Sequence, residues 1–235
     1  MSTLVDPSYP LPHQQTPAPL VRNTVRFKAA TMSQDVPSSV DYRKMDDARE
    51  WEQTATSRRP WRTECFDQFV AAIESSPVPV RRVLELGSGP GFLAAHVLQR
   101  IPDLEYVALD FSAAMHALAG QRLGALAGKV TFVERSFKEP GWGADLGPFE
   151  CVVTNQAVHE LRHKRHAAKL HSEVRQLLVP GGSYLVCDHF LGSDGMANDQ
   201  LYMTTEEQRA ALEGVGFSEV TELWRKGGLV LHRAR

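Results

Sequence analysis

The chain has 235 residues, which suits one α/β domain or two small ones. Hydrophobic residues make up 43% of it and charged residues 23%, a composition that excludes collagen, disulfide-rich scaffolds and wholesale disorder. With 26 Lys and Arg against 28 Asp and Glu, the formal net charge is −2, so the overall charge favours neither nucleic acid nor an anionic membrane as a partner.

The N-terminal residues lack the basic start and the apolar stretch of a secretion signal. No apolar run approaches the ~18 residues that a transmembrane helix needs. The three cysteines, Cys65, Cys151 and Cys187, form no closely spaced cluster and cannot all pair with one another, which is typical of a reducing compartment. We therefore expect a cytoplasmic protein with buried thiols.

The first segment is rich in proline and poor in aromatic residues. Because such a segment buries little apolar surface, we expect residues 1–40 to form an extended or disordered arm. The composition changes from Asp41 onward, and Phe66, Phe69 and Ile73 fall at helical spacing. One or two helices are therefore predicted within residues 41–76, where they would form a small lid over a substrate.

From Pro77 onward, short β-rich runs alternate with longer helical patterns, which indicates a parallel sheet with crossover helices. The predicted strands of this part are 82–86, 104–109, 130–133, 149–154 and 183–187. A helix within 161–178 is expected to stop at Pro180-Gly181-Gly182. Near the C-terminus, a helix over 205–213 precedes two β-rich runs joined by Lys226-Gly227-Gly228, which predicts an antiparallel hairpin.

A glycine-rich loop, Glu85-Leu86-Gly87-Ser88-Gly89-Pro90-Gly91, joins the first predicted strand to an apolar helix. Glycines let a ligand approach the backbone closely, and the helix N-terminus supplies free N–H groups. The next residue is Phe92, where a dinucleotide site needs a small residue, and no Gly-Lys-Ser or Gly-Lys-Thr follows for a phosphate-cradling loop. A tight turn without a ligand is the alternative interpretation.

An acidic residue closes the second predicted strand. Asp110 lies 19 residues after Gly91, where a carboxylate can accept hydrogen bonds from both ribose hydroxyls of an adenosine. The neighbouring Phe111 is placed to lie against the adenine face. The loop and the carboxylate together predict a ligand that contains adenosine.

At this point the chain resembles the class I S-adenosylmethionine-dependent methyltransferases. The resemblance covers residues from about 81 to the C-terminus and rests on motifs in the family's order, which are Val83 to Gly91, Leu109 to Met115, Phe149 to Leu161, Leu178 to Gly182 and Gly216 to Val220. It implies a Rossmann-like, doubly wound sheet of seven mostly parallel strands with an antiparallel end, and S-adenosyl-L-methionine as the cofactor.

The resemblance also assigns roles to residues. Gly87, Gly89 and Gly91 would flank the methionine part of the cofactor, and Glu85 stands in the family's acidic position. Asp110 would bind the ribose, while Asn155 and Gln156 would line the floor near the sulfonium. Near the adenine the family often has an acidic residue, whereas this chain has Ser136 followed by Phe137.

His159-Glu160-Leu161-Arg162-His163 matches the His-Glu-x-x-His pattern of zinc peptidases. No suitably spaced third ligand follows, and the motif comes directly after a strand-like run, so we expect no metal site here. His159 would instead face a substrate, and a neutral histidine suits a general base, although a structural or substrate-contacting role is the alternative. His163, His166 and His171 are expected on a solvated, basic helix start.

Two further sets of polar residues lie near the predicted site. Asp188 and His189 end the fifth predicted strand, where capping of a loop is the simpler interpretation. In the lid, aromatic and guanidinium groups suit a planar or carboxylate-bearing molecule, although buried tryptophans beside solvated arginines would give the same pattern. These residues are Trp51, Arg58, Arg59, Trp61 and Arg62.

The loop that follows the fifth predicted strand, His189 to Met203, is too short to hold an insert for recognising nucleic acid or protein. The resulting hypothesis is methyl transfer from S-adenosylmethionine to a small-molecule acceptor. A catalytically degenerate cofactor-binding protein and the zinc peptidase are the alternatives.

Overall fold

The computed structural model describes residues 34–235. Most of the predicted arm, residues 1–33, lies outside the described residues, and residues 34–40 form neither helix nor strand. The prediction of one or two helices within residues 41–76 is confirmed, since this segment contains α1 (Met45–Arg58) and α2 (Arg62–Glu74). Over the described range, the chain has no helix with the length and apolar character needed to cross a bilayer.

A seven-stranded sheet forms the centre of the fold, in the order β3-β2-β1-β4-β5-β7-β6. Its strands are β1 (Arg82–Leu86), β2 (Glu105–Asp110), β3 (Val130–Glu134), β4 (Phe149–Asn155), β5 (Leu178–His189), β6 (Val220–Lys226) and β7 (Leu229–Ala234). The first five strands are parallel, and β7 runs antiparallel to both β5 and β6. The predicted sheet with its C-terminal hairpin is therefore confirmed.

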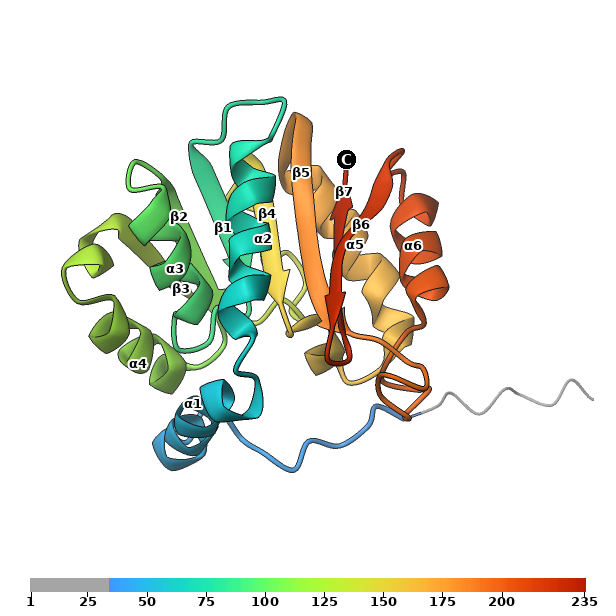
Figure 1. Ribbon diagram of the computed structural model, residues 1–235, viewed down its shortest axis with the longest axis horizontal. Helices are drawn as coiled ribbons and strands as arrows, with labels where there is room; N and C mark the ends of the chain where they lie inside the picture. Colours follow the sequence, from blue (N-terminus) through green and yellow to red (C-terminus); the bar gives the residue numbers. More distant parts are fainter. Residues whose placement is uncertain (1–33) are drawn as a thin grey trace, which may run out of the picture. The chain divides into compact units, whose positions relative to one another are not determined.

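Helices cover both faces of the sheet (Figure 1). On one face lie α2, α3 (Phe92–Arg100) and α4 (Ala113–Leu123), whose buried side chains share one apolar cluster with the sheet. On the other face lie α5 (Ala167–Leu177) and α6 (Thr205–Gly214). Figure 1 shows α1 beyond the carboxyl ends of the parallel strands, where it contacts α4 through a smaller apolar cluster.

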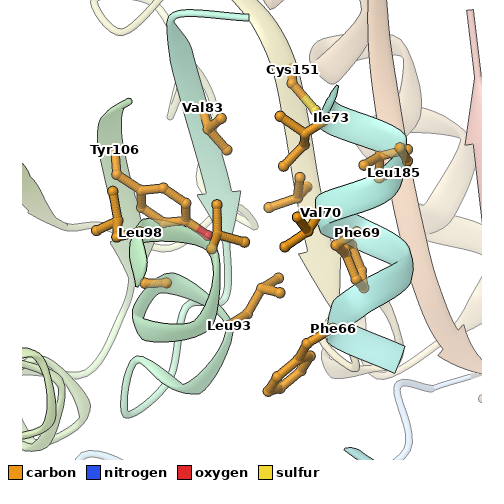
Figure 2. Close-up of a cluster of buried hydrophobic side chains, with 14 of the residues drawn as sticks. Phe66, Phe69, Val70, Ile73, Val83, Leu93, Leu98, Tyr106, Cys151 and Leu185 are labelled. Atoms are coloured by element: carbon orange, nitrogen blue, oxygen red, sulfur yellow. The ribbon is translucent and has the colours of Figure 1, made fainter. Parts of the chain in front are cut away.

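The apolar stripe of α2 fixes this helix to the sheet. Ile73 follows Val70 by three residues and Phe69 by four, so the three side chains share one face of the helix. Figure 2 shows this face packed toward Val83 and Leu185 on the sheet, and all five side chains are buried. Burial of large apolar side chains contributes about 1.5–3 kcal/mol each. The segment is therefore an integral part of the domain core.

The predicted helix within 161–178 begins later than its sequence suggests. Two short 3₁₀ turns, η2 (Val158–Leu161) and η3 (Lys164–His166), precede α5, which starts at Ala167. The expected solvated position of His171 is therefore wrong, because this residue falls on the inner stripe of α5. It is fully buried, and its ring lies 5.6 Å from that of Tyr184 on β5.

The strand after α5 is longer than predicted. Leu178 is already extended, and β5 includes Pro180, Gly181 and Gly182. The pairing with β4 shifts register between Phe149 and Cys151, so the Pro-Gly-Gly segment forms an irregularity inside the strand. The strand also continues to His189, which carries Asp188 to the edge where the other parallel strands end.

Candidate active site

The glycine loop leaves β1 and turns sharply into α3. Gly87, Gly89 and Gly91 all have positive φ angles, between 54° and 74°, a conformation that favours glycine. The N–H groups of Gly87 and Ser88 donate to the carbonyl oxygen of Leu109 at the end of β2. The loop is thus fixed at the carboxyl edge of two neighbouring strands.

The three glycines have different surroundings. A Cβ added at Gly87 would overlap the Cβ of Ala157, whereas at Gly89 it would meet nothing within 4 Å. At Gly91 it would come within 3.0 Å of Ala119 on α4. Gly87 therefore permits close packing against the residues after β4, and Gly89 presents open backbone to a ligand.

Replacing Gly87 with alanine is expected to lower the free energy of unfolding by about 1–3 kcal/mol, because the new methyl group combines a strained φ angle with steric overlap. Urea denaturation measures the change. Gly120→Ala is the matched control, since this helical position of α4 has open space, and it should raise stability by up to about 1 kcal/mol. Equal effects of the two substitutions would contradict this account of the loop.

Asp110 connects β2 to the glycine loop. Its Oδ2 accepts the N–H of Gly89 at 2.8 Å, and its Oδ1 accepts the N–H of Ser112 at 3.0 Å. The side chain is almost fully buried. Burial raises the pKa of Asp110 to about 6, although the two backbone N–H groups act in the opposite direction. The carboxylate is thus held in place and has unused acceptor capacity.

Glu85 is buried at the end of β1 and accepts a hydrogen bond from the hydroxyl of Tyr106 at 2.8 Å. Burial raises the pKa of Glu85 to about 8, while the Tyr106 hydroxyl lowers it and the nearby charge of Asp110 raises it further. A cationic group brought beside this carboxyl would favour its charged form.

The residues after β4 form the floor of the same region. The N–H of Gln156 donates to the carbonyl oxygen of Cys187 at 2.7 Å, and Gln156 has a φ angle of 59°. The side-chain oxygen of Asn155 is buried without a hydrogen-bond partner among the described residues. A polar acceptor of this kind suits a ligand that brings positive charge.

His159 lies in η2, directly after these residues, and is held by Asp188. Its Nδ1 is 2.7 Å from Asp188 Oδ1, and its backbone N–H donates to Asp188 Oδ2 at 2.8 Å. The other ring nitrogen, Nε2, lies 3.4 Å from Oε1 of Glu160. The carboxylate of Asp188 therefore fixes both the backbone and the ring of His159. Asp188 does cap the loop, as predicted, but the sequence alone did not predict its contact with the imidazole of His159.

The two carboxylates set the charge of the histidine. Burial by itself would lower the pKa of His159, but the charges and hydrogen bonds of Asp188 and, to a smaller extent, Glu160 outweigh it and raise the pKa to about 10. The pKa of Asp188 is lowered in turn, because its attraction to His159 outweighs its own burial. The neighbouring His189 behaves differently, since burial lowers its pKa to about 4.

The peptidase-like motif does not place its histidines on one helical face. His159 belongs to the short turn η2, whereas His163 lies in extended backbone and its Nδ1 accepts the N–H of Arg165. Between residues 34 and 235, no group of three or more His, Cys, Asp or Glu side chains is arranged to hold a metal ion.

One cavity of about 1150 Å³ joins these groups at the carboxyl edge of the sheet. Fourteen of the fifteen predicted site residues line it, namely Trp51, Arg58, Trp61, Arg62, Glu85, Gly87, Gly89, Asp110, Phe111, Ser136, Phe137, Asn155, Gln156 and His159. Gly91 does not line it, because this residue faces α4. Arg59 and His189 line it as well, and Arg59 Nη2 donates to the Nε2 of His189 at 3.1 Å.

Residues 83–182 match the family described as a methyltransferase domain. The chain is 28% identical over 171 residues to a ribosomal protein L11 methyltransferase of Rhizobium leguminosarum bv. trifolii, covering 72% of this chain and 51% of that protein. It is 32% identical over 93 residues to a malonyl-[acyl-carrier protein] O-methyltransferase of Magnetococcus marinus, covering 39% and 33%. The chain thus spans about half the length, or less, of these relatives.

The fold is also similar to that of human N-acetylserotonin methyltransferase, whose structure was solved in complex with SAM. The TM-score is 0.63 at 18% identity, and the match covers 83% of this chain and 57% of that one. The glycine loop lies within the segment that matches the methyltransferase domain. Residues 83–182 thus match a methyltransferase domain in sequence, and the chain has the fold of these methyltransferases.

Proposed function

We propose that this chain transfers a methyl group from S-adenosylmethionine to a small-molecule acceptor, and that His159 removes the acceptor's proton. One observation carries the proposal. The glycine loop, the Asp110 carboxylate and the paired His159 and Asp188 line or adjoin a single cavity, so cofactor-binding groups and a proton-accepting group face the same space.

The groups present fit the cofactor. The open backbone at Gly89 leaves room for the methionine part, and Asp110 can accept both ribose hydroxyls. The unpartnered oxygen of Asn155 suits the positive charge of a sulfonium. We assign the adenine to the stretch of wall formed by Phe111, Ser136 and Phe137. When bound, the cofactor supplies an electrophilic methyl group.

His159 would accept the proton at Nε2. Because Asp188 occupies Nδ1 and fixes the ring, the nitrogen that exchanges a proton with an acceptor is Nε2, which lies 3.4 Å from Glu160 Oε1. Methyl transfer is a direct displacement, so the remaining task of the protein is to align the acceptor and to exclude water. We assign that task to the part of the predicted lid that precedes α2, through Trp51, Arg58 and Trp61 on the cavity wall.

The contact between His159 and Asp188 determines how the rate of methyl transfer should depend on pH. Since the pKa of His159 is raised to about 10, most of the free enzyme holds a charged imidazole at neutral pH, and turnover should rise as the pH increases from 7 to 9. Asp188→Asn removes the charge that favours the imidazolium but leaves its burial, so the ascending limb should move to lower pH. Initial rates between pH 6 and pH 10 measure this, and identical limbs in both proteins would contradict it.

A small acceptor is supported by the tryptophans and arginines that α1 and α2 place on the cavity wall. Of the two relatives described above, one is named for a ribosomal protein and the other for malonyl-[acyl-carrier protein], so the class of acceptor differs between them. We also propose a cytoplasmic location, which the three free thiols support.

A transfer assay tests the function. The protein is incubated with S-adenosylmethionine labelled in its methyl group, together with either a panel of phenols, carboxylic acids and amines or purified ribosomal protein L11. Label in a small product is the expected result. Label only in the protein would overturn the small-molecule proposal, and calorimetric binding of S-adenosylhomocysteine without any transfer would indicate a degenerate binding protein.

A further inference from the structure

A buried cation lies at the start of α2, on the wall of the cavity. Arg62 is the first residue of α2, and it is only 5% exposed although it lines the cavity. Its Nη2 donates to the carbonyl oxygen of Ala55 at 3.2 Å, while its Nε is buried without a hydrogen-bond partner among the described residues. The guanidinium therefore keeps at least one unused donor inside the protein.

The surroundings of Arg62 offer rings but no counter-charge. Its Cζ lies 5.5 Å from the ring centroid of Trp51, 5.9 Å from that of Phe66 and 5.0 Å from that of Phe92. None of the ion pairs within residues 34–235 includes Arg62, and the nearby Glu52 pairs with Arg122 instead. Burial lowers the pKa of Arg62 to about 10, which still leaves it charged at neutral pH.

A buried charge without a partner is costly, and such groups are normally paired. Two further cations, Arg59 and Arg122, lie close enough to Arg62 to lower its pKa. The helix dipole adds positive potential at the start of α2, and no side chain caps this end. This part of the cavity therefore suits an anion supplied by the ligand, and a guanidinium fork matches a carboxylate.

The position of Arg62 distinguishes the cofactor from the acceptor as the source of that carboxylate. Arg62 contacts Phe92, the residue directly after the glycine loop and the first of α3. Arg59 instead reaches His189, whose ring lies 5.4 Å from that of His159. The two arginines thus serve different ends of one cavity, and Arg62 lies at the end occupied by the loop.

We propose that Arg62 binds the amino-acid carboxylate of the cofactor, with its Nε–H as one donor. This inference rests on the proposed function, because it takes the glycine loop as the methionine site. The sequence places Arg62 among the residues that would bind the acceptor. The present inference assigns it to the cofactor instead.

Calorimetric titration with two ligands tests the proposal. S-adenosylhomocysteine carries the carboxylate, whereas 5′-methylthioadenosine shares the adenosine and the sulfur but lacks the amino-acid part. Arg62→Gln is expected to weaken S-adenosylhomocysteine binding about 10- to 100-fold, the range for losing a charged hydrogen bond, and 5′-methylthioadenosine binding less than about 2-fold. Arg49→Gln, which removes an exposed arginine of α1, should change neither affinity.

The results of these titrations distinguish a failure of the Arg62 assignment from a failure of the proposed function. Equal losses for both ligands, or no loss for either, would overturn the role of Arg62. A rise in the acceptor's KM with unchanged S-adenosylhomocysteine affinity would also overturn it, because the carboxylate would then be the acceptor's. If wild-type protein binds neither ligand, the proposed function itself fails. Should thermal melting show Arg62→Gln unfolded, Arg62→Lys carries the test, since it should weaken S-adenosylhomocysteine alone by a few-fold.

Discussion

Replacing His159 with glutamine is expected to reduce the rate of methyl transfer by about 100- to 10,000-fold, the range for losing a general base. The ring nitrogen that would accept the proton disappears, whereas the glycine loop and Asp110 are unchanged. The affinity for S-adenosylhomocysteine should therefore stay within about 2-fold of wild type. Single-turnover rates with an acceptor from the transfer screen, together with calorimetry, measure both quantities.

His166→Gln is the matched control, because it removes a partly exposed histidine of η3 that does not line the cavity. It should leave the transfer rate unchanged. Full turnover in His159→Gln would exclude the base role and leave His159 as a structural residue. A parallel loss of cofactor affinity would show that the substitution disturbs the floor of the cavity instead.

Replacing Asp110 with alanine is expected to weaken S-adenosylhomocysteine binding by about 100-fold or more. The substitution removes a carboxylate that would accept two ribose hydroxyls, and each hydrogen bond to a charged group contributes about 1.5–3 kcal/mol. It also frees the N–H of Gly89, which Asp110 now holds. Asp103→Ala, at an exposed position before β2, should leave the affinity unchanged.

The pH dependence of binding gives a second test of Asp110. Burial raises its pKa to about 6, so the carboxylate is largely protonated at pH 5 and largely charged at pH 7. Wild-type affinity for S-adenosylhomocysteine should rise across this interval, and the affinity of Asp110→Ala should not. An equally steep rise in the variant would show that another group controls binding.

Much of the fold could be predicted because local patterns determine it. The β-rich runs, the helical spacing of Phe66, Phe69 and Ile73, and the turn at Gly227-Gly228 each follow from residues close together in the chain. The predictions are wrong where contacts between residues far apart in the sequence determine the secondary structure. Leu178 to Gly182 joins β5 because β4 pairs with it, and no local signal shows that partner.

The same distinction applies to the candidate site. The glycine loop and Asp110 carry a local pattern, and the parallel sheet brings both to one edge. The contact between His159 and Asp188 spans 29 residues and depends on β4 and β5 being neighbours. The position of Asp188 at the end of a strand was the available signal. The orientation of Gly91 toward Ala119 needed the packing of α3 against α4.

The most direct test of the central claim is a crystal structure of the protein with S-adenosylhomocysteine. It should show the ribose hydroxyls on the carboxylate of Asp110 and the homocysteine part along the glycine loop. The sulfur should face the space beside Asn155 and His159. A ligand bound elsewhere, or one whose ribose makes no contact with Asp110, would contradict the account.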